Sequence, residues 1–154
     1  PGQILTEAGR LAGIPGIIVQ GRYDLLCPPA TSHALASLWR DAEVPPLLSS
    51  FSEDALDAAR DAVPALPRAL LLDTLPADWL GRVARLECVA LVANHEVLTA
   101  DIVKTARAAG HRVLCYTPNE AARIGELAGW NVDGIVTDAV DHIVADSLPP
   151  APPL

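Results

Sequence analysis

The feature that most constrains the fold is a regular alternation of short apolar runs with longer amphipathic stretches. Apolar runs occupy residues 16–19, 46–49, 69–72, 88–92, 112–116 and 134–137. They are apolar at consecutive positions, as strands buried on both faces are. In the stretches between them apolar residues recur at helical spacing, as Ile102, Val103 and Ala106 do. A repeat of about 20 to 25 residues predicts parallel βα units, in a sheet or in a barrel.

Residues that begin and end helices support this reading. Helices are expected over residues 28–39, 52–63, 77–86, 99–109, 119–128 and 139–147, and one near 3–12. Ser52, Thr99 and Asn119 directly precede helical patterns, and such side chains accept hydrogen bonds from first-turn N–H groups. Gly110 and Gly129 stand where glycine commonly ends a helix.

Charge and composition exclude several classes of function. The net charge is −8 and Lys104 is the only lysine, whereas nucleic-acid partners require clustered basic residues. No apolar run is long enough to span a bilayer, and no amino-terminal secretion signal is visible. Cys27, Cys88 and Cys115 cannot all pair. We therefore expect free thiols in a reducing compartment and a cytoplasmic location.

Residues 45 to 143 carry a family resemblance in three strings. These are "PPLLSSFSEDALDAARDAVPALPRALLLDTLPADW", "RLECVALVANHEVLT" and "AGHRVLCYTPNEAARIGELAGWNVDGIVTDAVDHI". In this order they resemble the carboxyl-terminal part of glycerophosphodiester phosphodiesterases. The resemblance implies about the last five βα units of a (βα)₈ barrel. It also implies hydrolysis of glycerophosphodiesters to glycerol-3-phosphate and an alcohol.

By the same resemblance, the family's catalytic and metal-binding motifs lie in a part of the barrel that this sequence does not match. An amino-terminal "HRG" and a second histidine are the family's acid/base groups. A Glu-x-Asp pair and the Glu of an "E-x-K" strand bind a divalent metal, Ca²⁺ or Mg²⁺. Those motifs do not occur in this sequence, so the resemblance implies a metal without supplying its ligands. It places Ser50, Phe51, His95 and Tyr116 in the wall of the substrate pocket.

Residues 1 to 43 resemble a different family. The string "LAGIPGIIVQGRYDLLCPPATSHALASLWRDAE" is similar to a carboxyl-terminal segment of proline iminopeptidases, which are serine peptidases of the α/β-hydrolase fold. There the strand-end aspartate is the triad acid, a role that maps onto Asp24. No G-x-S-x-G nucleophile motif occurs in the chain. Asp24 is thus an orphan triad acid by resemblance, or an aspartate that caps the turn before Pro28.

Polar residues gather where the predicted strands end, which is where barrel enzymes place substrate contacts. They are Ser49, Ser50, Asp73, Asn94, His95, Tyr116, Thr117 and Asp138. The cluster Asn94-His95-Glu96 either lines a pocket or is ordinary loop polarity. The helix start at Pro118 and Asn119 could receive an anion, although Glu120 and the net charge oppose phosphate. The remaining histidines, His33, His111 and His142, are expected to be structural.

The sequence therefore predicts an α/β chain of parallel βα units that resembles a partial (βα)₈ barrel with an extra hydrolase-like βα unit at its front. The expected parts are residues 1–43, residues 44–148 and a proline-rich tail at 149–154. The expected function is that of a glycerophosphodiester phosphodiesterase. The alternatives are a non-catalytic chimeric fragment and a proline iminopeptidase remnant. Open sheet edges predict self-association.

Overall fold

The computed structural model describes residues 17–20, 46–139, 141 and 143. Backbone contacts divide the chain into two units, residues 1–70 and residues 71–154. The helices expected over residues 3–12 and 28–39, and most of that over 139–147, lie outside the described residues. No helix in the described ranges is long and apolar enough to cross a membrane.

The first unit contains parallel strands and one helix. Its elements are β1 (Ile17–Gln20), β2 (Leu47–Ser50), α3 (Glu53–Ala62) and the start of β3 (Arg68–Leu72). Ile18 of β1 pairs with Leu48 of β2, which in turn pairs with Arg68 of β3. Helix α3 begins after Ser52, whose hydroxyl accepts a hydrogen bond from the N–H of Ala55 at 3.3 Å. The predicted cap at Ser52 is therefore confirmed.

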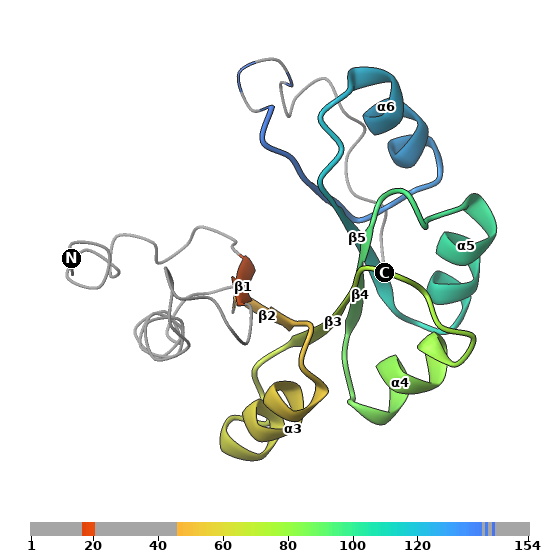
Figure 1. The fold of residues 1–154 in the computed structure, drawn as a ribbon. Coiled ribbons are helices and arrows are strands. Elements are labelled where there is room, and N and C mark those ends of the chain that lie inside the picture. The colour runs from red at the N-terminus through yellow and green to blue at the C-terminus, as the bar shows by residue number, and fades with distance from the viewer. Residues whose placement is uncertain (1–16, 21–45, 140, 142, 144–154) are drawn as a thin grey trace. The chain divides into compact units, whose positions relative to one another are not determined.

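The second unit repeats the βα pattern. Its elements are α4 (Trp79–Arg85), β4 (Ala90–Asn94), α5 (Ala100–Ala108), β5 (Arg112–Tyr116), α6 (Ala121–Gly129) and β6 (Gly134–Val136). β5 pairs in parallel with β4 on one side and with β6 on the other. Helices α4, α5 and α6 lie on the same side of these strands (Figure 1). The expected α/β class with parallel βα units is confirmed.

Burial follows the predicted hydrophobic pattern. The consecutive residues 90–93 of β4 are all buried, as the uninterrupted apolar run indicates. On α5, Val103 and Ala106 are fully buried and Ile102 is half-buried. Cys88 and Cys115 are buried free thiols, as expected, whereas Cys27 lies outside the described residues. Burial raises the pKa of the Cys115 thiol to about 12, although the nearby Arg123 acts in the opposite direction.

Helices α4, α5 and α6 end in the same way. Each is followed by a residue with left-handed backbone: Glu87 at φ 52°, Gly110 at φ 86° and Asn131 at φ 64°. The N–H of the next residue then bonds to a carbonyl five positions back, from Cys88 to Val83, from His111 to Ala106 and from Val132 to Leu127. This is the Schellman arrangement, which satisfies carbonyl groups at a helix end.

This arrangement corrects two expectations. Gly110 ends its helix as predicted, but Gly129 is still helical and Asn131 adopts the left-handed conformation in its place. The strand expected over residues 88–92 occupies Ala90–Asn94 instead, because the N–H of Cys88 still belongs to the end of α4. The change places Asn94 as the last residue of β4 and His95 directly after it.

A third correction concerns the start of α6. Thr99 caps α5 as expected, accepting from the N–H of Ile102 at 3.3 Å. Asn119 does not cap α6, since the N-cap residue is Glu120. The side-chain oxygen of Asn119 instead accepts from the hydroxyl of Thr137 at 3.0 Å and from the N–H of Asp138 at 2.9 Å. These two donors from beyond β6 hold the side chain away from the helix.

Candidate functional site

Polar side chains at the carboxyl ends of three strands meet in the second unit. The side-chain amide of Asn94, at the end of β4, donates to Asp73 Oδ1 at 3.1 Å. The hydroxyl of Tyr116, at the end of β5, donates to the carbonyl of Leu72 at 3.1 Å and lies 3.5 Å from Asp73 Oδ1. The prediction that strand-end residues gather at one edge is confirmed for Asp73, Asn94 and Tyr116.

The Tyr116 phenol is held in its neutral form. Burial, and then the negative charge of Asp73, raise its pKa to about 12. At neutral pH the hydroxyl is therefore a hydrogen-bond donor and acceptor rather than a base.

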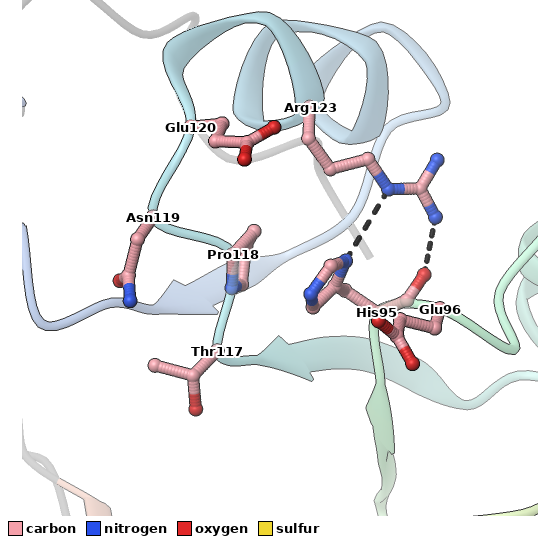
Figure 2. Close-up of a pocket in the computed structure, with 7 residues that line it drawn as sticks. All are labelled: His95, Glu96, Thr117, Pro118, Asn119, Glu120 and Arg123. Carbon is pink, nitrogen blue, oxygen red and sulfur yellow. Dashed lines mark hydrogen bonds between the residues drawn. The ribbon is translucent and has the colours of Figure 1, made fainter.

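A pocket of about 430 Å³ opens beside this cluster, between the β4–α5 loop and the start of α6. Figure 2 shows its lining residues: His95, Glu96, Thr117, Pro118, Asn119, Glu120 and Arg123. The sequence-predicted residue His95 lies in this pocket. Tyr116 directly precedes the lining residue Thr117 but is not itself part of the lining. Of the Asn94-His95-Glu96 cluster, His95 and Glu96 line this pocket and Asn94 does not.

The backbone around His95 is fixed by the adjoining strand. Its N–H donates to the carbonyl of Tyr116 at 2.8 Å, which extends the β4–β5 ladder by one residue. The side-chain oxygen of Asn94 accepts from the N–H of Glu96 at 3.0 Å, and the carbonyl of Asn94 accepts from Val97 at 3.2 Å. The loop therefore leaves the strand in a tight, hydrogen-bonded turn that directs His95 into the pocket.

Arg123 is the lining residue that the sequence did not single out. Its Nε lies 3.5 Å from His95 Nδ1, and its Nη2 donates to the carbonyls of His95 and of Leu98, the latter at 3.3 Å. Nη1 lies 2.5 Å from a Glu126 carboxylate oxygen, and the guanidinium lies 4.8 Å from the centre of the Trp130 ring. A cation in a first helical turn opposes the helix dipole, and this was a signal available in the sequence.

The charges of the lining do not favour an anion. Glu96 and Glu120 both line the pocket and are exposed, against the single guanidinium of Arg123. That guanidinium is already paired with Glu126. The lining therefore suits hydroxyl and other neutral polar groups better than a phosphate. The same expectation follows from the sequence at this helix start, because Glu120 opposes the binding of an anion there.

The other predicted pocket residues belong to the first unit. Ser50, at the end of β2, is 5% exposed, and its hydroxyl accepts from the N–H of Ser52 at 3.1 Å. Phe51 follows it and is 49% exposed. Ser49 is buried, and its hydroxyl makes no hydrogen bond in the described part of the chain. Asp24, the predicted orphan triad acid, lies outside the described residues.

Of the histidines expected to be structural, His111 is described and fits that expectation. Its Nδ1 lies 3.1 Å from the carbonyl of Cys88, at the opposite end of the strands from the pocket. His33 and His142 fall among residues that the structure does not describe.

The described residues do not form a binding site for a divalent metal. Among the described residues, no group of three or more His, Cys, Asp or Glu side chains could hold an ion. Asp73 is the nearest candidate, but its Oδ1 accepts from Asn94, and that amide's own oxygen accepts from Glu96. Ca²⁺ takes about six to eight oxygen ligands, and Mg²⁺ requires near-octahedral geometry. Within the described ranges, this chain therefore offers no set of ligands for a divalent metal.

Comparison with known proteins gives the family. A model of the glycerophosphoryl diester phosphodiesterase family matches residues 30–142. A phosphodiesterase from Oleispira antarctica, solved with its product sn-glycerol-3-phosphate, is 26% identical with a TM-score of 0.65, and the match covers 71% of this chain and 44% of that one. The chain therefore belongs to the glycerophosphoryl diester phosphodiesterase family.

A further structure supports the fold. A glycerophosphodiester phosphodiesterase from Parabacteroides distasonis superimposes with a TM-score of 0.72 over 90% of this chain and 59% of that one, at 21% identity. The parallel βα units are thus those of a partial (βα)₈ barrel. The chain spans about half the length of these solved relatives.

A second, shorter match involves another family. A proline iminopeptidase from Xanthomonas citri is 45% identical over 42 residues, which is 27% of this chain and 13% of that protein. The resemblance of one segment to iminopeptidases is therefore confirmed.

Proposed function

We propose that this chain acts in the hydrolysis of glycerophosphodiesters to sn-glycerol-3-phosphate and an alcohol. The observation that carries the proposal is the family match over residues 30–142. It is supported by the pocket at the carboxyl ends of β4 and β5, because barrel enzymes place their active sites at that end of the strands. The product-bound relative from Oleispira antarctica supports the choice of substrate class.

Within this reaction, the residues of this chain would form part of the wall of the substrate pocket. His95 is the best supported, since it lines the pocket from a well-fixed loop. Ser50, Phe51 and Tyr116 remain proposals for the same role. Since the lining does not favour an anion, His95 and Thr117 would contact hydroxyl oxygens of the substrate. The phosphodiester and the family's divalent metal, Ca²⁺ or Mg²⁺, would be bound by residues other than those described.

A second candidate is a non-catalytic chimeric fragment. The short iminopeptidase match favours it, because two families contribute to one chain. Under this reading residues 1–43 are a hydrolase-like segment, residues 44–148 a partial barrel and residues 149–154 a tail. The weaker alternative, an iminopeptidase remnant built around Asp24, rests on the same match.

The test is release of sn-glycerol-3-phosphate from glycerophosphocholine by the purified chain, with Ca²⁺ or Mg²⁺ and then with EDTA. The proposal expects metal-dependent release that EDTA abolishes. His95→Ala should raise KM by about two- to tenfold, the equivalent of one hydrogen bond. The matched variant His111→Ala should leave KM unchanged, since His111 lies at the other strand ends. No release under any condition would reject hydrolysis by this chain and favour the second candidate.

Self-association is part of the same proposal. Within the described residues β1 pairs only with β2, and β6 only with β5. A strand with one unpaired side invites pairing with another chain. Light scattering after size exclusion should therefore show a mass above that of one chain, rising with concentration. A monomer at all concentrations would contradict this.

A further inference from the structure

Arg123 makes an unusual set of contacts for a residue that lines a pocket. Its Nη2 donates to the carbonyls of His95 and Leu98, which lie at the two ends of the loop between β4 and α5. Its Nε points to the ring nitrogen Nδ1 of His95 at 3.5 Å. One side chain therefore holds both the backbone of this loop and the ring of His95.

The guanidinium is itself held firmly from the helix side. Nη1 pairs with Glu126, three residues further along α6, and the group lies over the Trp130 ring. The Arg123 side chain is mostly buried, with 21% of it exposed. An arginine whose donors are engaged by the protein is poorly suited to bind a substrate anion, but its planar fork is well suited to orient its partners.

The contact with Nδ1 has a chemical consequence. Arginine can only donate, so the ring nitrogen that faces it must accept and cannot carry the proton. In the neutral imidazole the proton then resides on Nε2. Figure 2 shows this second nitrogen on the side of the ring away from Arg123. The arrangement gives His95 a defined N–H donor in the pocket.

We propose that Arg123 is a positioning residue that fixes the β4–α5 loop and the tautomer of His95, so that the Nε2–H of His95 donates to a neutral oxygen of the substrate. The substrate part of this proposal rests on the proposed function. The orienting part concerns this chain alone and can be measured without any ligand.

The first experiment measures the tautomer of His95 by long-range ¹H–¹⁵N correlation spectra of the ¹⁵N-labelled chain. The spectra are recorded on the neutral ring, which the chemical shifts of its two nitrogens identify directly. His95→Gln assigns the signals by removing them. We expect His95 to be protonated on Nε2, and Arg123→Gln to raise the share of the Nδ1–H form by about two- to tenfold.

Two controls isolate the orienting contact. Arg82→Gln makes the same change at a helical arginine of α4, whose Nε bonds to Asp78 at 3.0 Å. Glu126→Gln removes the ion partner of Arg123 but leaves its contacts to the loop. Both should leave the tautomer unchanged. A His95 tautomer that does not respond to Arg123→Gln, or a ring protonated on Nδ1 in the unaltered chain, would overturn the proposal.

A reciprocal measurement covers the case in which Arg123→Gln fails to fold. The Nε–H of Arg123 should exchange with solvent about two- to tenfold faster in His95→Ala than in the unaltered chain, because its acceptor is lost. An unchanged exchange rate would show that the contact at 3.5 Å does not exist in solution.

The second experiment measures binding of glycerophosphocholine by titration. The terminal amide of Gln can place an N–H near the position of Nε2, whereas the shorter Asn cannot. We expect His95→Asn and Arg123→Gln to weaken binding by about two- to tenfold, and His95→Gln to retain most of it. Equal losses for His95→Gln and His95→Asn would overturn the donor role.

Together, the two experiments distinguish a failure of the proposed function from a failure of the orienting role of Arg123. If the tautomer responds to Arg123 but the chain neither binds nor hydrolyses glycerophosphocholine, the proposed function fails and the orienting role stands. If hydrolysis is observed but Arg123→Gln changes neither the tautomer nor the affinity, the orienting role fails alone.

Discussion

The two ends of the strands in the second unit use polar side chains in opposite ways. At the amino ends, the side chain of Asp133 is 2% exposed and bonds to three partners: Arg107 at 2.9 Å, Arg112 at 3.2 Å and the N–H of Val113 at 2.8 Å. At the carboxyl ends, Asp73 accepts from Asn94 at 3.1 Å, and the next residue, His95, lines a pocket. The first arrangement stabilises the fold, and the second leaves groups available for a ligand.

The largest effect is expected from the amino ends. Asp133→Asn removes a buried carboxylate on which two arginines and a strand N–H converge. It should lower the free energy of unfolding by about 2–3 kcal/mol, less than for a fully buried pair because both arginines are partly exposed. Urea unfolding measures this.

The matched control for that variant is Asp78→Asn. Asp78 is a surface residue paired with Arg82 four positions along α4. Water and salt screen exposed pairs of this kind, which therefore contribute little to stability, so the urea midpoint should scarcely move. Equal losses for the two variants would contradict the assignment of stability to the amino ends.

A smaller effect is expected at the loop between β5 and α6. Asn119→Ala removes the acceptor for Thr137 and for the N–H of Asp138. The cost should be about 1 kcal/mol, since each such bond contributes modestly to stability. Amide exchange at Asp138 should become faster, while exchange at Val113, whose acceptor is Asp133, should not. A faster rate at both would mean that the two ends are not independent.

The smallest effect on stability at neutral pH is expected from the Tyr116 hydroxyl, but its contribution has a distinctive dependence on alkaline pH. Its pKa is raised from 10.0 to about 12, so deprotonation is easier in the unfolded chain. The contribution of this group to stability is present below pH 10 and is lost as pH rises through about 12. Titration of phenolate absorbance should show one tyrosine ionising late.

The sequence contains a control for that titration. Tyr23 and Tyr116 are its two tyrosines. Tyr116→Phe should remove the late step, and Tyr23→Phe should retain it. A late step that survives Tyr116→Phe would contradict the assignment of the raised pKa to the strand-end cluster.

Local signals explain which parts of the fold could be predicted from the sequence. β5 occupies Arg112–Tyr116 as predicted because an apolar run follows a helix-ending glycine. β4 begins two residues later than the strand expected over residues 88–92, because nothing in the residue type of Glu87 indicates the left-handed backbone that ends α4. For the same reason, the left-handed residue after α6 is Asn131 and not the expected Gly129. The helix end is determined by a backbone conformation that several residue types can adopt.

The site was predictable in its location but not in its contacts. Strand-end placement follows from the βα pattern, so Asp73, Asn94, His95 and Tyr116 could be found. The contact between Arg123 and His95 joins residues 28 positions apart, and the bond between Asn94 and Asp73 joins residues 21 apart. Such pairings depend on how successive loops approach one another, and hydrophobic periodicity carries no information on that.

The repeated helix ending has an evolutionary consequence. Because α4, α5 and α6 each end through hydrogen bonds within their own last turns, each helix-to-strand corner is specified locally and does not depend on the neighbouring unit. Genes for such proteins can then be cut and rejoined between βα units without erasing the signals that fold the remaining ones.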